Sequence, residues 1–215
     1  MRGSPNVIIR AWRKFHPETE NGKSSVANQI DTRVAIIRAA ENISKTQGIA
    51  KLTLDQVAKD AGISKGGLLY HFPNKNALIE GMLQYSLEAF NLFIDDYTKK
   101  DKAPGAWARG FIKGTFPSRN TATKTKAASA SSVVVSAGLN PALLKSYIAQ
   151  QEEWIPRLIA DGLDEMTANL IRFAVDGVWL NEALGIKPLT AKAQQRFVDY
   201  LLSLTYTDKT PGKQG

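Results

Sequence analysis

The 215-residue chain contains no cysteine and only two histidines, His16 and His71. The lack of cysteine excludes disulfides, thiolate zinc sites and cysteine nucleophiles, and two histidines so far apart do not predict a metal site. No apolar run approaches the roughly 18 residues of a membrane-spanning helix, and the first residues lack the apolar core of a secretory signal. We therefore expect a cytoplasmic protein with no metal, no cofactor and no membrane partner.

Motifs of catalysis are also missing. The sequence has no nucleophile elbow, no glycine-rich phosphate loop and no metal-ligand spacing. Ser118, Ser131 and Ser136 lie in segments that hold no histidine to activate them. We expect no enzymatic activity.

Positive charge is concentrated in the first third of the chain. The formal net charge is +8, and residues 1–75 hold 12 Lys and Arg against 6 Asp and Glu, a net of +6. Residues 76–215 hold 16 against 14, a net of +2. Basic proteins without an anionic partner are common, but this distribution favours a polyanion bound by the N-terminal region.

Apolar residues recur at helical spacing along most of the chain, which predicts an all-α protein without a convincing strand. Residues 1–30 have no sustained period and predict a flexible extension, with an opening MRGS typical of vector-derived sequence. Residues 208–215 predict a flexible tail. The predicted helices run from Asp31 to Gly48, after Thr53, from Ser64 to about Phe72, from Lys75 onward as one long helix, and over about 106–114, 141–161, 164–185 and 190–205.

Two short helices follow each other closely in the basic region. Thr53 followed by Gln56 forms a capping box that predicts a helix start, and Gly62 occupies the position after the helix end, where glycine takes a left-handed conformation easily. Ser64 then caps a second short helix. Two such helices around a glycine-containing turn, preceded by a third helix, are typical of a helix-turn-helix.

The second short helix contains two consecutive glycines, Gly66 and Gly67. Each weakens a helix interior by roughly 1 kcal/mol relative to alanine. In a helix-turn-helix the second helix enters the DNA major groove, so bare main chain there allows close approach to bases and phosphates. The alternative is a glycine-rich connection between helices that pack on each other.

The stretch LTLDQVAKDAGISKGGLLYHFPNKNALIEGML, residues 52–83, resembles the DNA-binding signature of the tetracycline-repressor (TetR/AcrR-like) family of bacterial transcription regulators. The resemblance covers about residues 31–80. It implies an N-terminal three-helix helix-turn-helix DNA-binding domain over residues 31–76. A long helix would join it to a larger C-terminal helical domain for ligand binding and dimerisation, residues 77–207.

The resemblance also implies which residues contact DNA. They include helix caps, a phosphate-gripping lysine at the head of the long helix, and the exposed side of the recognition helix: Thr53, Ser64, Lys65, Gly66, Gly67, Leu69, Tyr70, His71 and Lys75. One feature departs from the family pattern, because Leu69 stands where the family usually has tyrosine and Tyr70 follows one place later.

Several of these positions have a second interpretation. Lys65 and His71 are also compatible with ordinary surface residues, and Tyr70 is compatible with either core or surface. Arg10, Arg13, Lys14 and Lys23 form either a minor-groove arm or a passive tail.

The family resemblance implies a small-molecule effector pocket in the C-terminal domain. Aromatic side chains line pockets for apolar or aromatic ligands, although at helical spacing they are more often plain core. A carboxylate among them, at Asp176, would meet a cationic ligand with help from the aromatic faces, or would instead pair with Arg172 one turn away. The candidate ligand-binding residues are Phe90, Trp107, Phe111, Tyr147, Trp154, Phe173, Asp176 and Trp179.

The family also implies a homodimer, because palindromic DNA operators are read by two-fold symmetric proteins. We expect the last two helices to form a four-helix bundle with their mates. The candidate interface residues are Gly177, Leu180, Leu184, Phe197, Tyr200, Leu201 and Leu204. The leading hypothesis is a ligand-responsive repressor released from its operator by a small apolar, aromatic or cationic effector, and the alternative is a non-specific architectural DNA-binding protein without effector control.

Overall fold

The computed structural model describes residues 23–116, 141–183, 186 and 189–206, and within these the fold is all helical, as predicted. The predicted tail and residues 1–22 of the predicted extension lie outside the described residues. The elements are α2 (Lys23–Gln47), the short 3-10 helix η2 (Ile49–Lys51), α3 (Leu54–Asp60), α4 (Lys65–His71), α5 (Lys75–Lys100), α6 (Ala106–Thr115), α8 (Pro141–Ala160), α9 (Glu165–Ala183) and α10 (Ala191–Ser203).

The first described helix starts earlier than the sequence predicts. α2 begins at Lys23, so Asp31 lies inside the helix and is not its N-cap, and residues 23–30 of the predicted extension are helical. No glycine or proline occurs between Lys23 and Gln47. Adding residues to an existing helix is much easier than nucleating one, so α2 continues toward the N-terminus through this polar stretch. Its other end is as predicted, at Gly48, whose φ is 84°.

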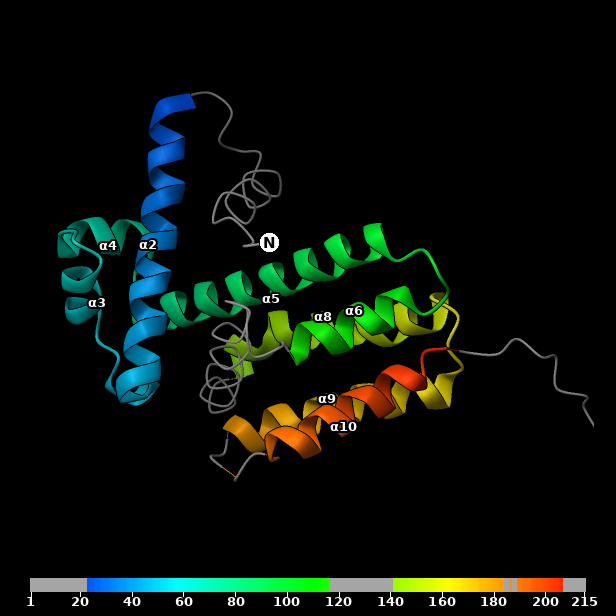
Figure 1. Cartoon of the computed structure of the whole chain (residues 1–215). Helices are drawn as coiled ribbons and strands as arrows, with labels where there is room; N and C mark the ends of the chain where they lie inside the picture. The colour runs from blue at the N-terminus through cyan, green and yellow to red at the C-terminus, as the bar shows by residue number, and fades with distance from the viewer. Residues whose placement is uncertain (1–22, 117–140, 184–185, 187–188, 207–215) are drawn as a thin grey trace, which may run out of the picture.

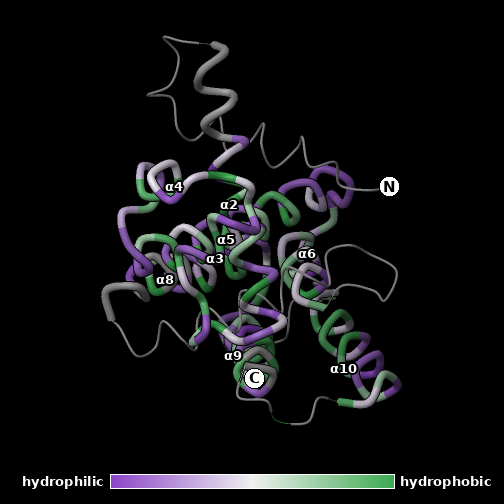
Figure 2. Tube along the Cα trace, turned by 90° about the vertical axis from the view of Figure 1, so that its left-hand side faces the viewer, coloured by the Kyte–Doolittle hydropathy of each residue, from purple (hydrophilic) through white to green (hydrophobic). Residues whose placement is uncertain are grey.

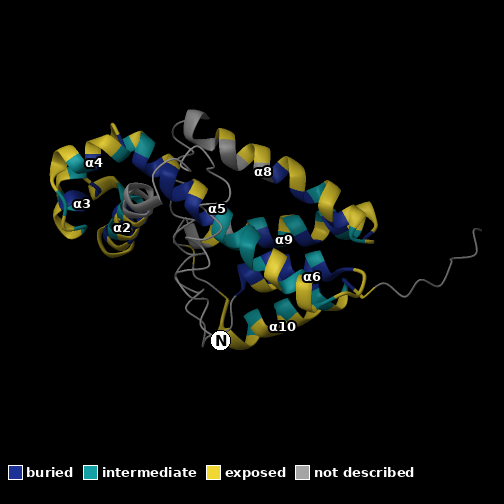
Figure 3. Ribbon diagram, turned by 90° about the horizontal axis from the view of Figure 1, so that it is seen from above, coloured by how far each residue is buried: buried dark blue, intermediate teal, exposed yellow. Residues whose placement is uncertain are grey.

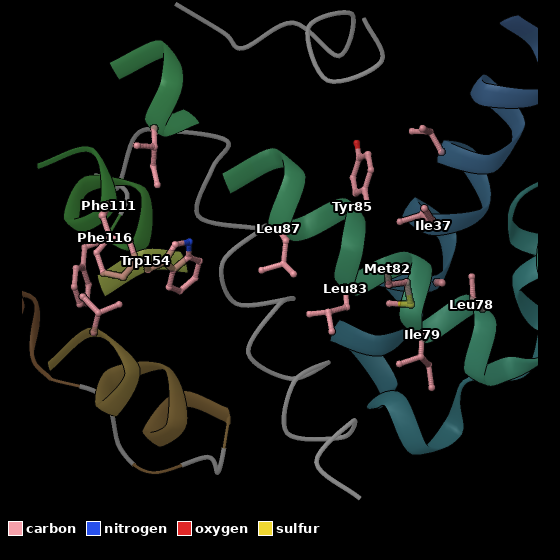
Figure 4. Packing of buried hydrophobic residues seen from close by; sticks show 14 of the residues in the cluster. Ile37, Leu78, Ile79, Met82, Leu83, Tyr85, Leu87, Phe111, Phe116 and Trp154 are labelled. Atoms are coloured by element: carbon pink, nitrogen blue, oxygen red, sulfur yellow. The ribbon is translucent and has the colours of Figure 1, made fainter. Parts of the chain in front are cut away.

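Helices α2, α3 and α4 pack together around the first half of α5 at one end of the molecule (Figure 1). The shared core is apolar and almost completely buried. Figure 4 shows Ile37 of α2 near Leu78, Ile79 and Met82 of α5. The remaining members include Ile36, Ala40, Ile43, Leu52, Val57, Ala58 and Leu68.

The same buried cluster continues along the second half of α5 and into α6, α8, α9 and α10 (Figures 1 and 3). Its fully buried residues include Phe111 on α6 and Trp154 on α8, with Ile171 and Val175 on α9. In Figure 2, hydrophobic segments of these helices alternate with hydrophilic ones along each tube, as expected for helices that are buried on one side. α5 therefore connects the two halves of the protein.

A glycine on α5 determines how closely α4 approaches it. A Cβ atom built at buried Gly81 would lie 2.5 Å from Cε1 of the Phe72 ring and 3.4 Å from Nη2 of Arg33. The Arg33 guanidinium lies over the Phe72 ring, 4.2 Å from its centroid, and its Nη1 donates a hydrogen bond to the carbonyl oxygen of His71 at 3.1 Å. Arg33 and Phe72 thus fix the end of α4 against α5.

At the far end of the molecule, a buried arginine ties three segments together. Arg109 Nε donates to Asp101 Oδ2 at 2.7 Å, and Nη1 donates to the carbonyl oxygens of Pro104 at 2.9 Å and Thr205 at 3.4 Å. Its hydrogen bonds hold the pKa of the Asp101 carboxyl at about 2. The end of α10 is therefore held against the connection between α5 and α6.

We predict that Gly81→Ala lowers the free energy of unfolding by roughly 1 to 3 kcal/mol, because the added methyl group overlaps the Phe72 ring. Urea unfolding followed by circular dichroism measures the change. Gly66→Ala on exposed α4 is the matched control, since its methyl group would approach only Ser64 Oγ, at 4.0 Å. Equal stability of both variants would contradict the close packing of Phe72 against Gly81.

Candidate nucleic-acid interface and aromatic core

The caps predicted around the two short helices are present. Thr53 Oγ1 accepts a hydrogen bond from the main-chain N–H of Gln56 at 3.3 Å, and Ser64 Oγ accepts from the N–H of Gly67 at 3.1 Å. Gly62 has a φ of 70°, in the left-handed region, and so turns the chain between α3 and α4. These local signals define both ends of the turn.

The glycine pair of α4 has no explanation in the packing of the described residues. A Cβ at exposed Gly66 would contact only Ser64 Oγ at 4.0 Å, and one at Gly67 would meet only the same oxygen, at 3.3 Å. Neither position touches another helix. The structure places both glycines inside α4, with no other helix near an added Cβ at either position.

The side chains of α4 divide between two faces. Leu68 and Phe72 are buried in the N-terminal core, whereas Tyr70 is 73% exposed and Leu69 is 37% exposed. The Tyr70 ring contacts the His71 ring edge-on, with centroids 5.2 Å apart. Of the two interpretations of Tyr70, the structure supports the surface one. His71 is half-buried, and burial together with the charge of Arg33 lowers the pKa of its imidazole.

Two lysines that the family resemblance places on DNA, Lys65 near base edges and Lys75 on a phosphate, are engaged with the chain itself. Lys65 Nζ forms an exposed ion pair with Asp55 of α3, at 2.9 Å. Lys75 Nζ donates to the carbonyl oxygen of Ala50 at 3.2 Å, which ties the first turn of α5 to η2. Exposed contacts of this kind are weak and exchange readily with other partners.

Thr53, Ser64, Lys65 and Gly66 are all exposed and, with Leu69 and Tyr70, belong to α3 and α4 or their N-caps. These two helices form one end of the molecule, where exposed residues predominate (Figure 3). The arrangement presents a helix N-terminus, open main chain and a cationic side chain on the same element. Such a combination suits an anionic, groove-shaped partner.

Four of the candidate ligand-binding residues meet in one aromatic cluster from α5, α6 and α8. Trp154 lies 5.6 Å from Phe90 and 5.1 Å from Phe111, between ring centroids. Phe90 and Phe111 are 5.7 Å apart, and Trp107 stacks on Phe111 at 5.6 Å. Figure 4 shows Phe111 and Trp154 side by side, near Phe116.

The other four candidates are not part of this cluster as described. The side chains of Tyr147 and Trp179 lie outside the described residues. Phe173 is 61% exposed on α9, with the Arg172 guanidinium 5.3 Å from its ring centroid. Asp176 Oδ2 lies 3.4 Å from Arg172 Nε, in the ion pair that one of the two interpretations predicts. Burial raises the pKa of the Asp176 carboxyl, and the charge of Arg172 opposes this.

Exposed apolar residues form a stripe along one face of α9. Its members are Met166, Leu170, Phe173, Gly177 and Leu180, at spacings that alternate between four and three residues. This spacing keeps side chains on one helix face, as in coiled coils. Gly177 and Leu180 are two of the candidate interface residues.

The remaining interface candidates are distributed differently. Tyr200 is exposed, Leu201 is buried within its own chain, and Phe197 and Leu204 pack partly against the same core. Burial of Leu201 therefore needs no partner. Leu184 lies outside the described residues.

Glu88 is a polar residue that the sequence analysis did not single out. It lies on α5 and is half-buried. Burial raises the pKa of its carboxyl to about 7, although a hydrogen bond involving Gln84 and the charge of Arg33 oppose the shift. In the sequence, only its position among the apolar neighbours of SLEAF indicates that Glu88 is buried.

The described residues contain no group of three or more His, Cys, Asp or Glu side chains that could hold a metal ion. None of their helices is both long enough and apolar enough to cross a membrane.

Two family models match this chain. Residues 36–82 match the model described as bacterial regulatory proteins, tetR family, and residues 105–206 match the model described as tetracyclin repressor-like, C-terminal domain. The first covers α3, α4 and parts of α2 and α5, and the second covers α6 to α10.

Similar proteins agree with these models. The regulator TtgR of Pseudomonas putida is 40% identical over 53 residues, a quarter of each chain. EthR of Mycobacterium tuberculosis is 26% identical over 125 residues, 55% of this chain and 57% of that protein. A solved transcriptional regulator from Rhodococcus has a TM-score of 0.66 at 18% identity, covering 80% of this chain and 95% of that one. The multidrug binding protein EbrR complexed with ethidium has a TM-score of 0.58 at 23% identity, covering 82% and 99%.

The pKa of Glu88 predicts a pH-dependent stability. The unfolded carboxyl ionises near its ordinary pKa of 4.5 and the folded one near 7, so this group progressively destabilises the fold as the pH rises from 4.5 to 7. Glu88→Gln keeps the neutral form at every pH. We expect the variant to be more stable than the native protein above pH 7, with a difference that shrinks toward zero near pH 4.5.

Urea unfolding at a series of pH values measures this difference. Glu80→Gln, at an exposed position of the same helix, is the control and should show no comparable pH-dependent gain. A gain from Glu88→Gln that stays constant between pH 4.5 and 8 would show that the carboxyl does not titrate in this range.

Proposed function

The chain belongs to the TetR family of bacterial transcription regulators, and on that premise we propose that it is a repressor that binds a palindromic operator as a homodimer and is released by a small-molecule effector. The proposed partners are double-stranded DNA, a second copy of the chain and the effector. Since its target is chromosomal DNA, we propose that it acts in the cytoplasm.

One observation carries the proposal of DNA contact. Gly66 and Gly67 weaken α4, and no contact among the described residues accounts for them. α4 nevertheless has a well-formed cap and an exposed face that carries Tyr70. An external partner that approaches the main chain closely explains why a helix would keep both glycines, and a DNA major groove is such a partner.

We propose that the two caps position the helix on the DNA backbone and that Lys65 reaches the edges of the bases. Ser64 lies at the N-terminus of α4, where main-chain N–H groups favour an anion. The ion pair between Lys65 and Asp55 is exposed, so an acceptor on a base edge can replace the carboxylate. Leu69 and Tyr70 would then lie along the groove.

We propose that the effector is an apolar, aromatic or cationic small molecule bound near the aromatic cluster of Phe90, Phe111 and Trp154. Two structural neighbours are the multidrug binding protein EbrR complexed with ethidium and with malachite green, and both molecules are aromatic. α5 contributes Phe90 to this cluster, and its Gly81 packs against Phe72 at the end of α4. An effector that prefers one position of α5 would therefore shift α4 and weaken DNA binding.

Dimerisation is proposed through the stripe on α9. Apolar side chains at heptad spacing form a seam that is buried when a second helix packs against it, and exposed Gly177 allows close approach there. Tyr200 on α10 would extend the surface. Phe173 would then belong to the interface and not to the effector site.

We predict that Gly66→Ala raises the free energy of unfolding by about 0.5–1 kcal/mol yet lowers affinity for the promoter DNA of its own gene about tenfold, because the methyl group meets DNA and no other helix. Lys65→Ala should also lower this affinity about tenfold. Electrophoretic mobility shifts at several salt concentrations measure both, and native binding should weaken steeply with salt.

The control for the lost charge is Lys100→Ala. Lys100 also forms an exposed ion pair with an aspartate, Asp96, but it lies at the other end of α5, and its loss should change affinity less than twofold. Unchanged DNA affinity of Gly66→Ala would contradict the proposed contact. Equal affinity of the native protein for promoter and random duplex would favour the architectural alternative.

We predict that Leu170→Asp converts the dimer into a folded monomer, because it places a charge in the middle of the proposed seam. Light scattering coupled to size-exclusion chromatography measures the mass in solution. Ile159→Asp, which alters an exposed apolar residue of α8 outside the stripe, should leave the dimer intact. A dimeric Leu170→Asp would rule out this face of α9 as the interface.

A further inference from the structure

Arg33 of α2 is half-buried where α2, α4 and α5 meet. Its Nη1 donates a hydrogen bond to the carbonyl oxygen of His71 at 3.1 Å, and its guanidinium lies 4.2 Å from the centroid of the Phe72 ring. Its Nη2 lies 3.4 Å from the position that a Cβ atom would occupy at Gly81 of α5. One side chain thus lies against the end of α4 and against α5 at the same time.

The carbonyl oxygen of His71 needs a donor from outside α4. His71 is the last residue of the helix, and the chain becomes extended at Phe72, with a φ of −140° and a ψ of 97°. The last carbonyl groups of a helix have no partner inside it, and Arg33 supplies one here. A hydrogen bond from a cation together with stacking on a ring fixes both the position and the rotation of the helix end.

The guanidinium lies on the buried side of α4. The Phe72 ring that it covers is 1% exposed, whereas Tyr70 on the other side of α4 is 73% exposed. Burial lowers the pKa of the Arg33 guanidinium, and the charge of Glu88 opposes this. A partly desolvated cation is costly unless its contacts compensate, so these contacts matter to the fold.

We propose that Arg33 is a positioning residue for DNA recognition, which contacts no DNA itself and holds α4 at the angle to α5 at which the exposed face of α4 fits the operator. A displaced α4 loses contacts with base edges, which carry sequence specificity, while the charge attraction to phosphates is largely kept. This inference rests on the proposed function and adds to it the residue that sets the discrimination between operator and other DNA.

The test uses Arg33→Lys, which keeps the charge but loses the planar stacking and the fork of donors. The probes are promoter DNA of its own gene and a random duplex of the same length, in mobility shifts at one salt concentration. We expect affinity for the promoter to fall about tenfold, the equivalent of a lost base contact, and affinity for the random duplex to change less than about twofold. Arg157→Lys, in an exposed ion pair of α8, is the matched control and should change neither affinity.

A second variant, Arg33→Met, distinguishes positioning from a direct phosphate contact. Loss of a phosphate contact would weaken binding to both duplexes and lower the slope of log affinity against log salt concentration by about 0.9. Positioning predicts the same promoter-specific loss as in Arg33→Lys, with an unchanged salt slope on the random duplex.

The imidazole of His71 reports on Arg33 without any DNA. Burial and the charge of Arg33 together lower the pKa of His71. Arg33→Met removes the charge and leaves the burial, so the pKa of His71 should rise in this variant. An NMR titration measures the change, and His16→Gln assigns the signals because the chain has only these two histidines.

The outcomes separate the two proposals. The positioning role is overturned by unchanged promoter affinity of Arg33→Lys, by a parallel loss on both duplexes, by a lower salt slope of Arg33→Met, or by an unmoved pKa of His71. In each case the proposed function stands as long as the native protein prefers its promoter. Equal affinity of the native protein for both duplexes overturns the proposed function and this inference with it. A promoter-specific loss with a raised pKa of His71 supports both.

Discussion

The contact between the end of α4 and α5 is the constraint on which the rest of the arrangement depends. Phe72 lies against Gly81, Arg33 covers the ring, and the same guanidinium binds the carbonyl oxygen of His71. α4 has only seven residues and one buried side chain of its own, so it has little independent rigidity. Its direction is therefore set by α5. Because α5 also contributes to the C-terminal core, the two halves of the protein cannot change position independently.

Polar residues of α2 and α5 lie beside this contact and connect it to the rest of α5. Arg33 contacts α4 directly, and its charge also affects the pKa of Glu88, one of the half-buried groups on α5. Glu88 lies close in sequence to Phe90 of the aromatic cluster. A short stretch of α5 thus carries both Gly81, against which Phe72 packs, and Phe90 at the edge of the proposed effector site. Movement of this stretch would couple the two sites.

Local structure could be predicted from the sequence wherever one side chain and its near neighbours decide it. The caps at Thr53 and Ser64 and the left-handed turn at Gly62 depend on groups within three residues, and all three are present. The start of α2 could not be predicted, because a polar stretch without glycine or proline gives no local stop. Contacts across the fold were also missed: neither the burial of Arg109 nor the exposure of Phe173 is visible in helical periodicity alone.

The buried guanidinium of Arg109 gives the residues that follow α10 an importance that their sequence does not suggest. Two of its acceptors, the carbonyl oxygen and the hydroxyl of Thr205, come from 96 residues further along the chain. A protease that trimmed the protein just before Thr205 would leave a desolvated cation with fewer partners. The stability of the fold thus depends on hydrogen bonds that Arg109 donates to Thr205, next to the last residue that the structure describes.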